Sequence, residues 1–480
     1  MSEVKVNKIS PRSGTTVTLG DSGDTFTIPS GATINNQGTA VNFGATGSAS
    51  WDTTVKTGDF TAVAGVGYFV NTTGGEIDVT LPAGSAGDVV AISDYANNFA
   101  TANCILIQNG SDKIGGSAVN ATLVVNGAAV TLVYVDATKG WIVTDSGNQS
   151  EASELKLYVT ATGGTITTSG NFKIHTFTGP GTFAASCLGN ASGSNTVDYL
   201  VVAGGASGGR GNAAGAGGGG AGGLRVSPGT ASGCWTASPR GASPAVALPV
   251  SGGPFSITVG GGGASQSSGG AAGVSGSVST FSSITSAGGG GGAGHCAVSG
   301  AGGSGGGGSS GPNNPSRTNQ AGGAGNTPPT NPIQGTSGGN GGANSGGYPS
   351  GGGGGAIAGG SNGVCSPADS AGANGGNGAQ VNIDTNNHYW AAGGGGSAWT
   401  GGGGQNGGGG GLGGGGGAAG PGGGGSAGTS ALNSGDAGNT TTGGGGGTNT
   451  GSGGGGGNGP SGSSGGGGSG IVIIRYKFQN

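Results

Sequence analysis

Runs of glycine between about residues 200 and 470 constrain this chain more than any other feature. Of the 132 glycines, 105 lie in the last 280 residues, and runs such as 288–292 and 453–457 recur. Average proteins contain about 7% glycine. Because glycine has no Cβ atom, glycine chains can lie unusually close together. An extended chain forms no internal hydrogen bonds, so each N–H and C=O must find its partner in another segment.

Two structures are compatible with such a tract: a disordered linker or an ordered bundle of polyglycine helices. Disordered tracts are normally rich in Glu and Lys, whereas residues 201–470 contain neither. Collagen is excluded because no strict Gly-X-Y period exists. Two apolar segments, 197–203 and 471–476, bracket the tract and are typical of buried strands. We therefore favour a C-terminal polyglycine II helix bundle that short strands close.

Charge and length exclude several classes of protein. The net charge is −4, and residues 201–480 carry 6 basic and 3 acidic side chains without a Lys/Arg cluster. Nucleic-acid binding requires many phosphate contacts, so we expect none. No run of 18 apolar residues occurs, so we expect no membrane insertion. The five cysteines are far apart, which favours reduced thiols. No secretory signal is visible at the N-terminus.

The remaining sequence predicts an all-β chain in four regions. Residues 1–50 contain short β-prone stretches and predict an N-terminal β-fibrous segment; a poorly ordered leader is the alternative. Apolar β-branched runs at regular spacing predict a β-sandwich, jelly-roll-like, over 51–147. A short β-region is expected over 155–203, followed by the glycine-rich bundle with a C-terminal strand over 204–480. Strands are expected at 68–71, 77–81, 88–93, 104–108, 123–125, 130–135, 141–144, 155–159, 172–177, 197–203 and 471–476.

Several of these segments resemble bacteriophage tail fibres. The motifs are VDYLVVAGG at 197–205, HTFTGPGTF at 175–183, GGGGAGGL at 217–224 and GSGIVIIRY at 468–476. Upstream, the segments 60–73 and 31–36 resemble modules of marine phage fibre proteins. The resemblance implies a virion protein whose glycine-rich domain is a receptor-binding adhesin, with glycine helices packed in a rigid slab and connecting loops that touch the receptor. It carries over no receptor-contact residue.

Chemical motifs give no support for an enzyme or a cofactor site. The segment 200–209 begins like a dinucleotide-binding loop, but neither a helix nor an acidic residue follows at the required spacing. The match to G-x-S-x-G at 335–339 lacks its strand–turn–helix context. The three histidines are isolated, and the acidic residues of 51–147 lie mostly in or beside turns. We expect no catalytic residue, no metal and no cofactor.

Large side chains in the insertions between glycine runs are the candidate binding residues. Polyglycine helices expose almost only backbone groups, and these are already hydrogen-bonded to neighbouring helices. Selective recognition of a partner must therefore come from side chains in the connections. Aromatic side chains supply contact area with little rotamer entropy, although each could instead pack the end of a glycine segment. The candidates lie chiefly in 381–399, with 234–240 and 312–334 as contributors: His388, Tyr389, Trp390, Trp399, Trp235, Arg240, Arg317 and Tyr348.

These features predict a structural virion protein, a phage tail fibre that binds the host surface. We expect the C-terminal domain to bind a bacterial surface glycan or outer-membrane protein, and the N-terminus to attach to a phage tail or adaptor protein. A fibrous N-terminus suggests a homotrimer, and release would follow host lysis. A non-adhesive spacer or a capsid or tail decoration protein is the first alternative. An ice-binding glycine-rich protein is the second, although irregular aromatic insertions do not suit it.

Overall fold

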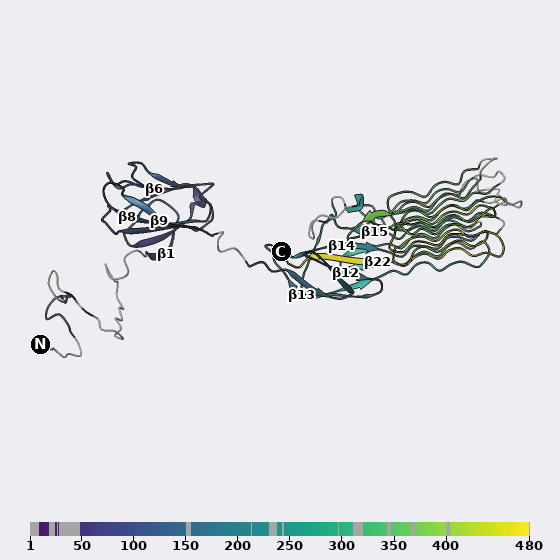
Figure 1. Cartoon of the computed structure of the whole chain (residues 1–480), viewed down its shortest axis with the longest axis horizontal. Coiled ribbons are helices and arrows are strands. Elements are labelled where there is room, and N and C mark those ends of the chain that lie inside the picture. Colours follow the sequence, from purple (N-terminus) through teal and green to yellow (C-terminus); the bar gives the residue numbers. More distant parts are fainter. Residues whose placement is uncertain are drawn as a thin grey trace. The chain divides into compact units, whose positions relative to one another are not determined.

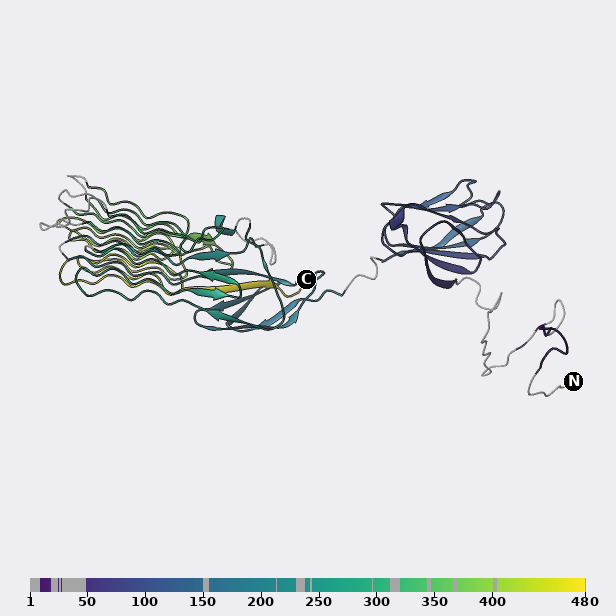
Figure 2. The same cartoon turned by 180° about the vertical axis from the view of Figure 1, so that it is seen from behind.

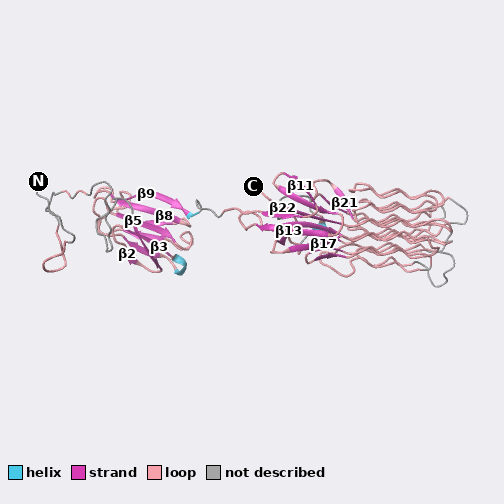
Figure 3. Ribbon diagram, turned by 90° about the horizontal axis from the view of Figure 1, so that it is seen from below, coloured by secondary structure: helices cyan, strands magenta, loops and turns pink. Residues whose placement is uncertain are grey.

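A computed structural model describes residues 9–18, 25, 27, 49–149, 155–212, 214–229, 238–241, 244–295, 297–310, 320–342, 347–365, 370–399 and 404–479. The chain divides into two compact units, Met1–Ser153 and Glu154–Asn480. The described residues contain strands and irregular segments but no α-helix, and the short cyan helices in Figure 3 are 3-10 turns. This confirms the expected all-β class. Short 3-10 turns occur at η1 (Thr72–Gly74) and η3 (Pro239–Gly241). Most of the predicted segment 1–50 lies outside the described residues.

Unit 1 contains two sheets that share one apolar core. The first has the order β1-β3-β5-β8-β9 and the second the order β2-β4-β6-β7. Tyr68, Ile92 and Leu132 from the first sheet and Val79 and Leu106 from the second are buried in this core. The strands are β1 (Ser50–Lys56), β2 (Phe60–Thr61), β3 (Val66–Val70), β4 (Ile77–Thr80), β5 (Val89–Asp94), β6 (Cys104–Ile107), β7 (Ala121–Leu123), β8 (Ala128–Tyr134) and β9 (Trp141–Asn148).

The chain winds between these two sheets from β1 to β6. As a result, β1, β3 and β5 pair in parallel in one sheet, and β2, β4 and β6 pair in parallel in the other. Parallel neighbours need a crossover connection, and here a strand of the opposite sheet supplies it. Only the pairs that involve β7, β8 and β9 are antiparallel. A jelly roll would instead have antiparallel sheets, so the order of strands differs from our expectation.

Unit 2 begins with two further sheets. Their orders are β10-β13-β17-β18-β19 and β11-β12-β22-β14-β15, with β16 beside β14. The strands are β10 (Val159–Thr162), β11 (Thr165–Ser169), β12 (Phe172–Phe177), β13 (Gly181–Leu188), β14 (Thr196–Val202), β15 (Leu224–Val226), β16 (Leu248–Pro249), β17 (Pro254–Thr258), β18 (Ser279–Phe281), β19 (Ile284–Ser286) and β22 (Ile471–Lys477), with the separate hairpin β20 (Ala379–Val381) and β21 (His388–Trp390).

Strands β14 and β22 are buried on both faces, which explains their nearly continuous apolar sequences. On one face, Tyr199, Val201 and Ile474 belong to a core shared with β13, β17 and β18. On the other face, Leu200 and Ile473 belong to a core that includes the β20–β21 hairpin. The C-terminal strand β22 therefore lies in the middle of its sheet, between β12 and β14.

The glycine-rich residues form an array of extended segments that run back and forth from the strands (Figures 1 and 2). The segment 217–222 shows the bonding pattern, because its successive N–H groups donate to three neighbouring segments in rotation. The bonds are Gly217 to Ala293 (2.9 Å), Gly218 to Gly351 (3.1 Å), Gly219 to Gly454 (2.8 Å), Gly220 to Gly290 (2.9 Å), Ala221 to Gly354 (3.0 Å) and Gly222 to Gly451 (2.8 Å). The pattern repeats every three residues.

The same segment shows why these positions are glycine. A Cβ atom on Gly218 would lie 2.1 Å from the carbonyl oxygen of Gly394. Cβ atoms on the next two residues would lie 2.2 Å from the Ala206 oxygen and 2.3 Å from the Ser304 oxygen. These contacts point to three further segments, whose own N–H groups donate to carbonyls of 217–222: Gly394 to Gly219 at 2.9 Å, Ala206 to Gly220 at 2.9 Å and Ser304 to Ala221 at 3.0 Å. The segment 217–222 is therefore enclosed by six neighbours, and at its glycines these neighbours approach too closely for a side chain.

Candidate functional site

Each segment of the array has a near end, where it meets the strands, and a far end at the opposite side of the array (Figure 1). The segment 391–399 starts directly after β21, so Trp399 lies at the far end. The segment that follows β14 likewise runs from Ala203 to a far end at Gly211. This direction separates the predicted binding residues into two groups.

The first group lies at the near end, in the β20–β21 hairpin. Trp390 is fully buried, and its indole Nε1–H donates to the Val381 carbonyl at 2.9 Å. It is part of the apolar core that covers the outer face of strands β14 and β22. Trp390 therefore has the alternative role, packing within the protein, and we leave this residue out of the proposed contact surface. His388 and Tyr389 are half-buried.

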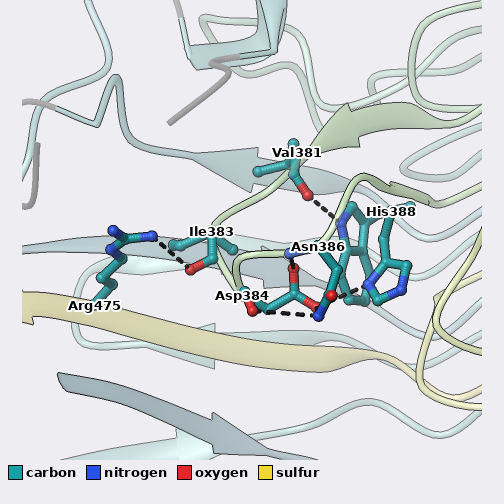
Figure 4. Close-up of polar contacts among 7 residues, drawn as sticks. Val381, Ile383, Asp384, Asn386, His388 and Arg475 are labelled. Carbon is teal, nitrogen blue, oxygen red and sulfur yellow. Dashed lines mark hydrogen bonds and ion pairs between the residues drawn. The ribbon is translucent and has the colours of Figure 1, made fainter. Parts of the chain in front are cut away.

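The turn of this hairpin is held by its own polar side chains (Figure 4). The Asp384 carboxylate accepts a bond from the Asn386 backbone N–H at 3.2 Å and pairs with His388 Nδ1 at 2.8 Å. The His388 ring also meets Trp390 edge-on, with 5.5 Å between ring centroids. Arg475 of β22 donates to the Ile383 carbonyl at 3.3 Å. These contacts fix the hairpin to the sheet and keep His388 in one orientation.

Arg240 also lies towards the near end. Its Nε–H donates to the Ala356 carbonyl at 2.7 Å, and burial lowers the pKa of the guanidinium. Ala356 belongs to the same core as Trp390. Arg240 is thus a partly buried cation with a structural bond. Trp235 and Arg317 lie outside the described residues.

The second group, Trp399 and Tyr348, lies at the far end on adjacent segments. The Trp399 N–H donates to the Gly347 carbonyl at 3.2 Å, and the Ser350 N–H donates to the Ser397 carbonyl at 3.0 Å. Both aromatic side chains are half-buried. Tyr348 has φ of 40°, in the left-handed region that non-glycine residues rarely adopt. The structure therefore brings together two aromatics that are 51 positions apart in the sequence.

Arg210 is a far-end residue that sequence reasoning missed. It is 4% exposed, and its guanidinium donates to the carbonyls of Pro460 at 2.6 Å, Gly459 at 3.2 Å and Ser267. A Cβ atom on Gly459 would lie 3.5 Å from the Trp399 ring. Arg210 therefore holds the turn against which Trp399 packs. Its own Nε and the buried Asn458 Oδ1 have no protein partner, which is uncommon for buried polar atoms.

A signal for the far-end group does exist in the sequence. A segment that leaves a strand must end far from the sheet, and the next one must return. Counting from the strand at 197–203 would therefore place alternate connections at opposite ends of the array. Distance along the sequence alone places 388–390 and Trp399 in one cluster, although they lie at opposite ends of the array.

No group of three His, Cys, Asp or Glu side chains suited to a metal ion occurs among the described residues. Within the same residues, no helix is long and apolar enough to span a membrane. Comparisons with models of protein families and with curated proteins find no match to this chain. Function must therefore be inferred from the residues and their geometry.

Proposed function

We propose that residues 204–470 form a polyglycine II helix bundle that the strands of unit 2 close at one end. The support is the rotation of hydrogen bonds through three neighbours with a period of three residues, since this helix has three residues per turn and no internal bonds. The close approach of six neighbours to the segment 217–222 agrees with hexagonal packing of such helices. We interpret the two sheets of unit 1, which share one core, as a β-sandwich.

We propose further that the chain is a phage tail fibre and that unit 2 binds the host surface. One observation carries this proposal: hydrogen-bonded backbone fills the interior of the array, whereas the large side chains lie in the connections between its segments. Inside the bundle, almost every N–H and C=O is committed to another segment, so only the connections can recognise a partner. A rigid backbone slab with variable connections is suited to present a binding surface.

The far end is the better candidate surface because it lies away from the strands. It carries Trp399 and Tyr348, and Arg210 fixes the adjoining turn. His388 and Tyr389 at the near end form a second, smaller candidate surface. A surface glycan or an outer-membrane protein suits either one, because aromatic side chains contact both sugars and protein. Attachment to the phage tail or an adaptor protein through the N-terminus, and a homotrimeric assembly, complete this proposal.

Adsorption of unit 2 to host cells tests the proposal. We expect a fragment of residues 154–480 to bind host cells and to block adsorption of the intact phage. Exchange of both far-end aromatics, Trp399→Ala with Tyr348→Ala, should weaken binding at least tenfold. Tyr389→Ala is the matched near-end variant and should retain binding.

Each alternative result has a clear meaning. Loss of binding only in Tyr389→Ala would move the surface to the near end. A folded fragment that binds no host cell would favour the spacer or decoration alternative. Inhibition of ice recrystallisation by that fragment would favour the ice-binding alternative. Circular dichroism and thermal melting of each variant serve as the control for folding.

A further inference from the structure

The outer face of the five-stranded sheet in unit 1 carries an exposed aromatic strip that the proposed function does not use. It consists of Trp51 on β1, Phe69 on β3 and Tyr95 directly after β5. Trp51 is 44% exposed and Tyr95 is 60% exposed, whereas Phe69 is half-buried. Large aromatic side chains exposed together on one sheet face are unusual for a soluble protein and commonly mark a binding site.

The indole of Trp51 lies directly over Gly67, which has no side chain. Trp51 pairs with Gly67 on β3, and a Cβ atom on Gly67 would lie 2.8 to 3.0 Å from three atoms of the indole. The indole therefore rests on the β3 backbone. Phe69 supports it from the side, with 4.8 Å between ring centroids and 30° between ring planes. One face of the indole is packed and the other is directed away from the sheet.

The alternation of side chains places Tyr95 on the same face. Asp94 is directed inwards, where its carboxylate accepts bonds from the backbone N–H groups of Asn98, Phe99 and Gly127. The Tyr95 N–H continues the ladder by donating to the Val70 carbonyl at 2.9 Å. β5 ends at Asp94, and Tyr95 begins a bend. Successive residues of an extended strand point to opposite faces, so we expect Tyr95, one residue after the inward Asp94, to point outwards like Phe69. The three aromatics thus form a diagonal across β1, β3 and the end of β5.

The rest of this face leaves the strip accessible from above. The cross-strand row that begins with Trp51 continues through Gly67, Ala91 and Thr131 to Asp145 on β9. The row that begins with Phe69 continues through Ser93, Ala129 and Gly147. The residues next to the aromatics in these rows have small side chains. The single charged group in these two rows, Asp145, is at the opposite edge, so the strip favours an uncharged ligand.

The size of the strip favours a small linear ligand over a protein. A Trp, Tyr or Phe side chain offers about 150–250 Å², so three partly exposed rings present roughly 200–300 Å². A stable protein interface needs about 800 Å² from each partner. Residues two apart on a strand are about 6.7 Å apart, and neighbouring strands lie about 4.8 Å apart. The diagonal is therefore about as long as three or four linked sugar rings.

We propose that this strip binds a linear, uncharged oligosaccharide, with sugar rings stacked on Trp51 and Tyr95. The apolar face of a pyranose presents C–H groups with partial positive charge, which suit the negative face of an aromatic ring. Phe69 fixes the indole, and Ser93, which pairs with Phe69, offers a hydroxyl group between the two stacking rings. Unit 1 is then a second, independent recognition site for polysaccharide on the same chain.

The test uses the full chain and four neutral probes: the hexasaccharides of β-1,3-glucose, β-1,4-glucose, α-1,4-glucose and β-1,4-mannose. Tryptophan fluorescence and calorimetric titration measure binding. We expect saturable binding of at least one probe. Trp51→Ala should weaken it at least tenfold, and Tyr95→Ala about threefold or more. Gly67→Ala should also weaken it while keeping all three aromatics, because the new methyl group must displace the indole.

Matched variants test whether binding is specific to the strip. Val119→Ala shortens a side chain of unit 1 that is 64% exposed and lies outside the strip, and it should leave binding of these probes unchanged. Trp51→Phe should restore part of the affinity lost in Trp51→Ala. Melting curves confirm that each variant is folded.

Two results would overturn the proposal. The first is a wild-type chain that binds none of the four probes. The second is a change of assembly in Trp51→Ala, seen as smaller particles in sedimentation, without a change in probe binding; the strip would then be an interface between copies of this chain.

Discussion

At the scale of single residues, glycines that look identical in the sequence have different surroundings in the array of extended segments. Gly394 donates its N–H to the Gly219 carbonyl at 2.9 Å, and a Cβ atom on it would lie 2.1 Å from the Gly454 carbonyl oxygen. Gly261 is in the same array, but a Cβ atom there would meet nothing within 4 Å. The two positions therefore have opposite tolerance for a methyl group.

This contrast gives a matched pair of variants. Gly394→Ala should lower the free energy of unfolding of unit 2 by about 1–3 kcal/mol or more, because the lattice must open to admit the methyl group. Gly261→Ala should leave it unchanged or raise it by about 0.4–1 kcal/mol, because alanine restricts the unfolded chain. Thermal and denaturant unfolding measure both. Equal losses in the two variants would contradict the close packing described above.

At the scale of elements, a buried histidine joins strands of unit 2. His175 of β12 is fully buried, with Nδ1 at 2.7 Å from the Gly163 carbonyl oxygen and Nε2 at 3.1 Å from the Tyr476 hydroxyl of β22. Its ring also meets Phe183 edge-on at 5.1 Å. Burial lowers the pKa of His175 below its usual value, and nearby Lys173 acts in the same direction.

The lowered pKa predicts how the stability of unit 2 depends on pH. Between the folded and unfolded pKa values, the unfolded chain binds the proton more readily, so stability rises with pH. The contribution of neutral His175 is complete above about pH 6.5 and declines as the pH falls below that value. The melting temperature of the wild type should therefore fall more than that of His175→Gln between pH 7.5 and pH 5. Parallel curves for the two proteins would refute this role.

Prediction from sequence succeeded for elements with strong apolar patterns. The strands expected at 172–177, 197–203 and 471–476 correspond to β12, β14 and β22. The segment 155–159 was expected as a strand, but β10 begins only at Val159. β11 and β13 were not expected, because Thr165–Ser169 and Gly181–Leu188 are rich in small and polar residues. These two strands form because β11 pairs with β12 and β13 pairs with β17, although their own sequences have no strong apolar pattern.

The candidate site was less predictable than the fold. Composition indicated aromatic insertions, but it gave no information on whether a ring faces a core or the surface. Trp390 fills a core because its neighbours are Val381, Ile383 and the outer face of β14. Trp51 was not singled out at all, since its exposure depends on Gly67, which is adjacent only through parallel pairing. Such long-range pairing has no local signature in the sequence.

At the scale of the whole molecule, the two units are built from different kinds of buried surface. Unit 1 has a core of large apolar side chains such as Phe99, Leu132 and Trp141. In unit 2, the strands have apolar cores, but the long array buries chiefly peptide groups hydrogen-bonded to one another. Exposure of apolar surface raises the heat capacity of unfolding, and exposure of polar surface lowers it.

Calorimetry of the full chain should therefore show two kinds of transition. We expect unit 1 to unfold with the usual heat-capacity change of about 12–15 cal/mol/K per residue. Unit 2 should show a distinctly smaller change per residue, because peptide groups dominate what it exposes. Scanning calorimetry of fragments 49–149 and 154–480 assigns the transitions. An equal heat-capacity change per residue in both would contradict the account of the array as a backbone lattice.

The position of β22 has a consequence for synthesis. It follows the glycine-rich array in the sequence and is the last of the described strands, yet it pairs with β12 on one side and β14 on the other. A chain cut short anywhere in the array would lack Ile471–Lys477 and leave a gap in the middle of that sheet. Only a chain that includes β22 can complete the sheet beside the array. We therefore expect proteases to remove chains truncated within the array in preference to chains that carry this strand.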